Sequence, residues 1–114
     1  MTDLKSIVQA LQLTVVTGLE QLDRPVTGVY ISDLLSDVMG KSQSGQLWLT
    51  IQGHTNVVAV AVLKDLQGII LTGGNEFDAG AIQKAKDEEI ILLKSTLSTY
   101  AVACALFQQG LLPE

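Results

Sequence analysis

One short stretch, Gln67-Gly68-Ile69-Ile70-Leu71-Thr72-Gly73-Gly74, limits what this chain can fold into more than any other. Its apolar centre shows no alternation and stops at paired glycines, which is typical of a strand buried on both faces of a parallel sheet. The glycines let the backbone turn sharply and approach whatever lies beyond the strand. The stretch therefore predicts an α/β fold with a ligand edge where this strand ends.

Repeated units of strand, polar turn and helix lie on both sides of this stretch. We expect strands at 13–16, 26–31, 47–51, 68–72 and 90–93, with 26–31 at a sheet edge because Pro25 precedes it. We expect helices at 4–11, 78–89 and 98–109, and a short helix that Ser32 and Asp33 cap, that runs to Val38 and that Gly40 closes. The expected fold class is α/β: a single-domain layered sandwich with a mostly parallel central sheet of about four to five strands flanked by helices.

Residues 56–63 can be read in two ways. Their valines favour a strand, whereas their alanines and the lack of alternation fit a buried helix. We interpret them as a helix, because strands 47–51 and 68–72 can then run parallel through a right-handed crossover, whereas a strand here would form a hairpin. At this length we expect residues 1–114 to form one domain.

Composition argues against several classes of partner and location. The net charge is −5 with no basic stripe, so neither nucleic acid nor anionic lipid is expected as the main partner. The longest apolar run, 57–63, is too short to span a bilayer, and the N-terminal residues do not follow the plan of a signal peptide. The single cysteine, Cys104, cannot form an internal disulfide, and its apolar helical setting predicts a buried reduced thiol. We therefore expect a cytoplasmic protein.

Low polarity predicts a homodimer. Only 17% of the residues are charged, and the mean hydropathy is +0.36. The expected helix at 56–63 has no polar face, so it must be covered on all sides. The sheet covers one side, and a second copy is expected to cover the other, through an interface centred on Val58 and Val62 that buries more than about 1,000 Å². An inner strand at 56–63 would be buried on two sides without any dimer.

Three turns are expected to meet at one edge, because ligands of an open parallel sheet bind past the carboxyl ends of its strands. The turns are 52–56, 72–76 and 94–98, and each precedes a helix N-terminus whose free N–H groups and dipole favour an anion. Every α/β sheet has such an edge, so capping and turn chemistry alone is the alternative. The candidate ligand-binding residues are His54, Thr55, Asn56, Thr72, Gly73, Gly74, Ser95 and Thr96, with Lys94 and Ser98 beside them.

No set of residues predicts catalysis, a metal or a cofactor. His54 is the only histidine, and no carboxylate partner or nucleophile accompanies it in a known spacing. One histidine and one cysteine in different segments do not make a zinc site. Gly40-Lys41-Ser42 resembles the end of a phosphate-binding loop, but Leu35 stands where that pattern needs glycine, and a helix rather than a strand precedes it.

Three segments taken together, 52–57, 68–74 and 91–100, resemble the DRTGG domain. The family's threonine falls on Thr55 and its glycine pair on Gly73 and Gly74, whereas its aspartate and arginine fall on Gly53 and His54 and are lost. The resemblance covers roughly residues 12–110. The DRTGG domain is similar to the N-terminal domain of HPr kinase/phosphorylase and to the middle domain of phosphate acetyltransferases, and it occurs between CBS domains in some inorganic pyrophosphatases. The catalytic half of HPr kinase has no counterpart here.

The resemblance implies a non-catalytic regulatory or assembly domain, not an enzyme. Together with the ligand edge, it predicts a dimer that senses a small anionic ligand, a nucleotide or a phosphorylated metabolite, at the glycine-rich strand ends. A protein partner is left open. The alternatives are a phosphotransferase-related protein, as a name of the HPr serine kinase type would suggest, or a ligand-free scaffold subunit of a metabolic complex.

Overall fold

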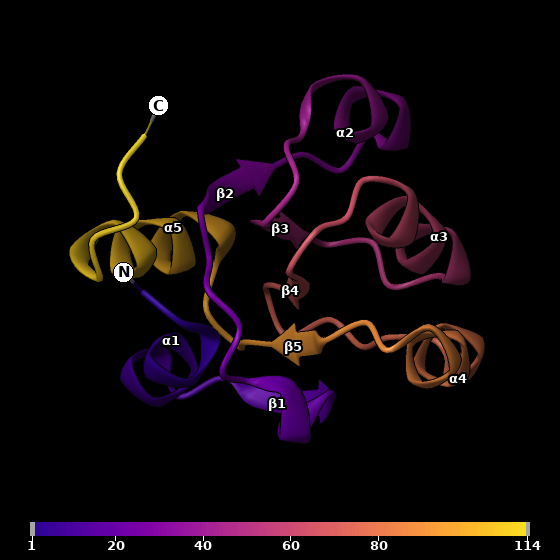
Figure 1. Cartoon of the computed structure of the whole chain (residues 1–114), viewed down its shortest axis with the longest axis horizontal. Coiled ribbons are helices and arrows are strands. Elements are labelled where there is room, and N and C mark those ends of the chain that lie inside the picture. Colours follow the sequence, from indigo (N-terminus) through magenta and orange to yellow (C-terminus); the bar gives the residue numbers. More distant parts are fainter. Residues whose placement is uncertain (1, 114) are drawn as a thin grey trace.

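A five-stranded sheet lies at the centre of the computed structural model, which describes residues 2–113 (Figure 1). Its strands are ordered β1-β5-β4-β3-β2. The elements in chain order are α1 (Leu4–Leu11), β1 (Thr14–Thr17), the short 3₁₀ helix η1 (Leu19–Gln21), β2 (Gly28–Ile31), α2 (Leu35–Lys41), β3 (Gln46–Thr50), α3 (Thr55–Leu63), β4 (Gly68–Leu71), α4 (Ala79–Glu88), β5 (Leu92–Lys94) and α5 (Thr99–Gln108).

Four of the strands run in one direction. β2, β3, β4 and β5 pair in parallel, so their carboxyl ends share one edge of the sheet. β1 pairs antiparallel with β5, so its first residue, Thr14, lies opposite Lys94 at the end of β5. The α/β class and the mostly parallel sheet are confirmed, and so is the edge position of the strand that follows Pro25.

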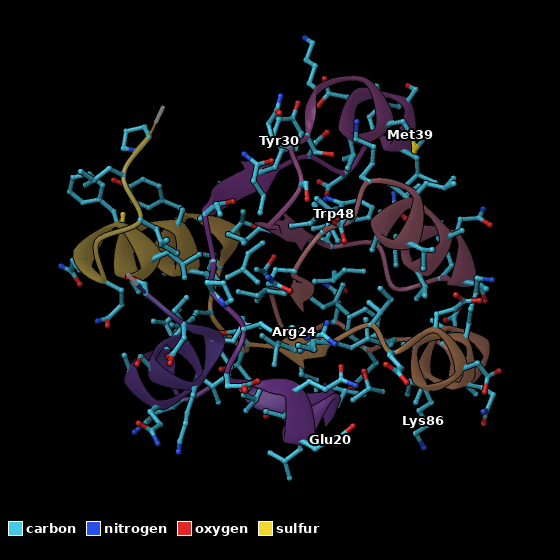
Figure 2. All side chains as sticks on the ribbon, viewed as in Figure 1. Glu20, Arg24, Tyr30, Met39, Trp48 and Lys86 are labelled. Carbon is cyan, nitrogen blue, oxygen red and sulfur yellow. The ribbon has the colours of Figure 1, made fainter. Side chains whose placement is uncertain are left out.

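Helices cover both faces of the sheet. α2, α3 and α4 pack on one face, and α1 and α5 pack on the other (Figure 1). Trp48 of β3 is fully buried between the sheet and the α2 and α3 layer (Figure 2), where its indole N–H donates to the Ser32 carbonyl oxygen at 2.8 Å. Within residues 2–113, no helix combines the length and the hydropathy needed to cross a membrane.

The ambiguous segment is a helix, as we interpreted it. α3 joins two parallel strands, β3 and β4, by a crossover. Its flanks are covered by α2 and α4 of the same chain, so a partner is not needed to cover them. Val58 is fully buried in the core, and the predicted interface centred on Val58 and Val62 is therefore wrong for Val58. Val62 is 39% exposed, and the homodimer itself stays a prediction.

Two local predictions are wrong. Cys104 is exposed rather than buried, because α5 lies in an outer layer that the sheet and α1 cover from one side only. The cap of α2 is also different: the helix begins at Leu35, its cap residue Leu34 makes no side-chain cap bond, and Gly40 lies inside the helix rather than at its end. The Asp33 carboxylate instead accepts hydrogen bonds at the end of β3.

Candidate functional site

The three predicted turns meet at the carboxyl edge of the sheet. The second turn bonds to the third, because the N–H groups of Gly73 and Gly74 donate to carbonyl oxygens of residues 95–97. The first turn bonds to the segment that follows the second, since the Asp78 N–H donates to the Gly53 carbonyl oxygen at 2.8 Å. All eight candidate residues therefore lie along one edge, and they form two groups with different properties. Their binding of a ligand stays a prediction.

Gly73 and Gly74 have a structural role in the second turn. Gly73 and Gly74 both have φ of +74°, a left-handed conformation that costs an L side chain free energy. The Gly73 N–H donates to the Leu97 carbonyl oxygen at 2.7 Å, and the Gly74 N–H donates to the Ser95 carbonyl oxygen at 3.1 Å. These amides are used within the protein, so the prediction that they receive an anion finds no free donor here.

Thr72 is equally committed to the fold. It is fully buried, and its hydroxyl lies 2.6 Å from the Thr99 hydroxyl at the start of α5. Its N–H donates to the Thr50 carbonyl oxygen at 3.1 Å, which ties the end of β4 to the end of β3. A buried threonine with its hydrogen bonds made holds the edge together, and its binding of a ligand stays a prediction.

A hollow of about 80 Å³ lies beside the glycine turn. It is far below the roughly 300 to 1,000 Å³ of sites for nucleotide-sized ligands. Its one lysine, Lys94, is neutralised, because the ammonium nitrogen lies 2.7 and 2.6 Å from the two carboxylate oxygens of Glu76. The hollow is lined by Thr14, Gly74, Asn75, Glu76, Lys94, Ser95 and Thr96.

The first turn keeps unused hydrogen-bonding groups. His54 caps α3 without a side-chain bond, and its buried Nδ1 has no partner among residues 2–113. Thr55 and Asn56 are exposed in the first turn of α3, and within the same residues neither of their N–H groups has an acceptor. The N-terminus of α4 lies next to them, since a Cβ placed on Gly80 would be 3.1 Å from the Thr55 hydroxyl. Two helix N-termini thus lie side by side.

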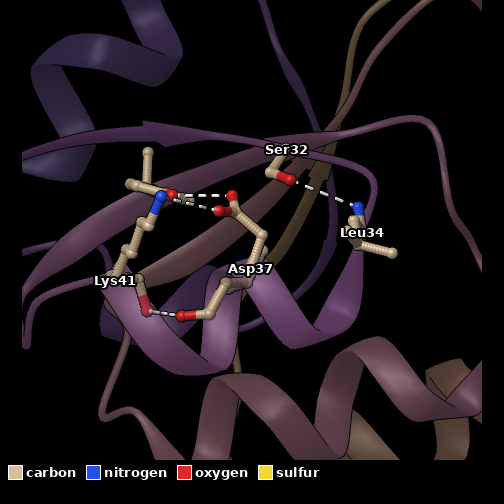
Figure 3. A network of polar contacts seen from close by, with 7 residues as sticks. Ser32, Leu34, Asp37 and Lys41 are labelled. Carbon is tan, nitrogen blue, oxygen red and sulfur yellow. Dashed lines mark hydrogen bonds and ion pairs between the residues drawn. The ribbon is translucent and has the colours of Figure 1, made fainter.

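A polar network beside this edge fastens α2 to the end of β2 (Figure 3). The Tyr30 hydroxyl donates to the Asp37 carboxylate at 2.7 Å, and the Lys41 ammonium lies 3.7 Å from the same carboxylate. The hydrogen bond from Tyr30, and then one from Ser32, lowers the pKa of Asp37 below its ordinary 3.8. The same bond raises the pKa of Tyr30. The network positions α2, and none of these contacts involves a residue of the first turn of α3.

Comparison with known proteins decides the family. The model of the DRTGG domain matches residues 6–108. The chain belongs to the DRTGG domain family. One similar solved structure is the crystal structure of the CBS and DRTGG domains of the regulatory region of Clostridium perfringens pyrophosphatase, complexed with its activator diadenosine tetraphosphate. It is 15% identical with a TM-score of 0.76 over 99% of this chain, a likeness that shows the fold. No curated protein matches.

This DRTGG domain covers 51% of that regulatory region, about half of its length. It also departs from the family where our resemblance places an aspartate, at Gly53. A Cβ on Gly53 would overlap the Glu76 carbonyl oxygen and lie 3.1 Å from the Phe77 Cα atom. The first turn therefore packs against residues 76–78 so closely that no side chain fits at position 53 without a shift of the backbone.

Sequence reasoning missed three groups of this edge. Asp33 was assigned to a helix cap, yet its carboxylate accepts from the Thr50 hydroxyl at 2.8 Å and from the Ile51 N–H at 2.9 Å. Thr14 reaches the edge only because β1 is antiparallel, a direction that no local pattern indicates. Glu76 pairs with Lys94 across two loops, and only their opposite charge could have suggested the pair.

Proposed function

We propose that this DRTGG domain is a non-catalytic regulatory domain that binds one phosphate group of a small ligand at the paired N-termini of α3 and α4. The observation that carries the proposal is the exposed first turn of α3, where the N–H groups of Thr55 and Asn56 lack acceptors among residues 2–113 and a second helix N-terminus lies alongside. Free N–H groups and two helix dipoles favour an anion at this place.

Side-chain charge restricts which anion fits. Asp33 lies against the end of β3, Glu76 lies in the second turn, and Asp78 caps α4. The lysine of the three turns, Lys94, is paired with Glu76. Within residues 2–113, Asp33 and Asp78 form no ion pair, and these two carboxylates oppose a ligand of high negative charge. A nucleoside monophosphate or a singly phosphorylated metabolite therefore fits better than a polyphosphate.

The structural neighbour supports a regulatory role. It is a regulatory region of a pyrophosphatase that contains a DRTGG domain and is in complex with a nucleotide activator. That region is twice as long and only 15% identical, so the ligand of this chain is inferred from its own residues. The charge of this edge favours fewer phosphates than the four of that activator.

The test is calorimetric titration and thermal shift with AMP, ATP and inorganic phosphate. We expect AMP to bind more tightly than ATP, and AMP at 100 times its dissociation constant to stabilise the fold by about 2.7 kcal/mol. Thr55→Pro should abolish this binding, because proline at the first position of a helix removes the N–H while it keeps the helix. His54, which precedes it, already has the extended backbone that proline requires.

Thr55→Ala is the matched control, since it removes the hydroxyl and keeps the N–H. We expect it to bind AMP as the parent does. Equal binding by Thr55→Pro and the parent would exclude the amide site, and a lack of binding by all three probes would overturn the proposal. Turnover of ATP or pyrophosphate that His54→Ala abolishes would contradict the non-catalytic role.

A further inference from the structure

The two edges of the sheet differ in how they are protected. β1 carries a register shift between Val15 and Thr17, a bulge of the kind that prevents further strand pairing. β2 pairs with β3 in unbroken register from Gly28 to Ile31, and no bulge interrupts it. β2 is therefore an open and regular edge, which is the arrangement that accepts another strand.

The register identifies the free backbone groups of β2. Tyr30 lies opposite Trp48, and the Ser32 N–H donates to the Leu49 carbonyl oxygen, so even-numbered residues bond to β3. In a parallel pair, alternate residues point both backbone groups away from the partner strand. The N–H and C=O groups of Val29 and Ile31 therefore point outward, and none of them has a partner among residues 2–113.

An apolar groove of about 400 Å³ follows the same edge on the α5 face. Ile31, Phe107 and Leu112 line it and remain 48%, 54% and 63% exposed. Among residues 2–113, the only charged residue that lines it is Lys41. The lining that these residues form therefore places no acids of two copies against each other, although the chain has a net charge of −5.

We propose that β2 pairs antiparallel with β2 of a second copy about a two-fold axis at Tyr30, so that the two sheets become one of ten strands. With Tyr30 facing Tyr30 of the second copy, Val29 lies opposite Ile31 and Ile31 opposite Val29. Both are then hydrogen-bonded pairs, and all four outward groups of each copy are satisfied. The outward backbone groups of β2 are thus complementary to the same groups of a second copy, and a two-fold interface requires such self-complementarity.

The apolar area agrees with a pair of copies. An aromatic side chain buries about 150 to 250 Å² when it is fully covered. At about 100 Å² for each half-exposed side chain, from the middle of that range, Ile31, Phe107 and Leu112 together offer about 300 Å² per copy. Two copies then bury about 600 Å² of apolar surface, more than half of the roughly 1,000 Å² that a stable interface needs. The proposal requires the backbone and the polar rim around β2 to supply the remainder. This interface replaces the one predicted at Val58 and Val62.

Light scattering on the full chain tests the association. We expect a mass of twice 12.2 kDa at micromolar concentration. Ile31→Lys should raise the dissociation constant by at least about tenfold, while the circular dichroism spectrum stays unchanged because Ile31 is half-exposed. Phe107→Glu, on α5, is a second variant with the same expected effect. The matched control is Leu63→Lys, on the opposite face and 71% exposed, which should leave the mass at the dimer value.

Disulfide trapping tests the register in a Cys104→Ser background. Tyr30→Cys should crosslink to itself, because facing residues of a non-hydrogen-bonded pair have Cα atoms about 4.5 Å apart. Val29→Cys and Ile31→Cys should each stay uncrosslinked alone and crosslink when mixed. A monomeric parent would overturn the proposal, as would a dimer that Val62→Lys splits and Ile31→Lys does not. Self-crosslinking of Val29→Cys without that of Tyr30→Cys would refute the register.

Discussion

Replacing Gly53 with alanine measures how closely the first turn packs on the segment 76–78. The new Cβ would overlap the Glu76 carbonyl oxygen, which is backbone and cannot rotate away. Relief requires the turn to move, and this movement weakens the 2.8 Å bond from the Asp78 N–H to the Gly53 carbonyl oxygen. Overpacking costs about 1 to 3 kcal/mol and the hydrogen bond about 1 kcal/mol. We expect a loss of about 2 to 4 kcal/mol, or about 8 to 16 °C in melting temperature for a domain of this size.

Urea unfolding followed by the fluorescence of Trp48 provides the assay, because Trp48 is fully buried and is the only tryptophan. Gly40→Ala is the control: it lies inside α2 with nothing within 4 Å of its Cβ position, so the same substitution should stabilise by about 0.5 to 1 kcal/mol. The denaturant slope should be the same in both variants. If Gly53→Ala unfolds at the parent's midpoint while Gly40→Ala behaves as expected, the close packing at Gly53 does not exist.

Two further predictions concern the glycine turn and the Tyr30–Asp37 pair. Gly73→Val and Gly74→Val should each lower the melting temperature measured by calorimetry, because both glycines have φ of +74° and a non-glycine residue there costs about 1 to 2 kcal/mol; unchanged melting temperatures would contradict this. The folded pKa of Asp37 lies below its ordinary 3.8, so its stabilising contribution is present above pH 3.8 and is lost as the pH falls through the folded pKa. Tyr30→Phe should therefore be less stable than the parent at neutral pH, with a difference that shrinks in acid; a difference that persists in acid would show that the carboxylate is not its origin.

The sequence allowed prediction of the architecture because short local patterns of residues indicate most of its strands and helices. Apolar runs that stop at glycine placed β3 and β4, and the alanines of residues 56–63 favoured the helix that the structure contains. Which side of an apolar helix is covered depends on neighbours far away in sequence. For that reason Val58 was expected at a surface and is in the core, whereas Cys104 was expected in the core and is exposed.

The sequence allowed prediction of where the candidate site lies. It did not allow prediction of which backbone N–H groups of the site are free and which are hydrogen-bonded. Parallel strands bring their carboxyl ends to one edge, so the three turns had to meet there. Whether a given N–H is free depends on loop-to-loop hydrogen bonds such as those from Gly73 and Gly74 to residues 95–97. No spacing in the sequence encodes those bonds, and they are what moves the proposed site from the glycine pair to the first turn of α3.

The residues that this chain shares with the DRTGG motif lie in two different turns of the edge. Gly73 and Gly74 bind β4 to the loop before α5, and this role needs glycine for its backbone conformation alone. Thr55 lies at the start of α3, where the N–H groups of Thr55 and Asn56 have no acceptor within residues 2–113. The turn before α3 is joined to the start of α4, because the Gly53 carbonyl oxygen accepts a hydrogen bond from the Asp78 N–H. A phosphate held at both helix N-termini would bridge the elements that this single bond connects, so ligand binding and the packing at Gly53 should strengthen each other. Such mutual strengthening would let a small domain convert the presence of a ligand into a stiffer carboxyl edge.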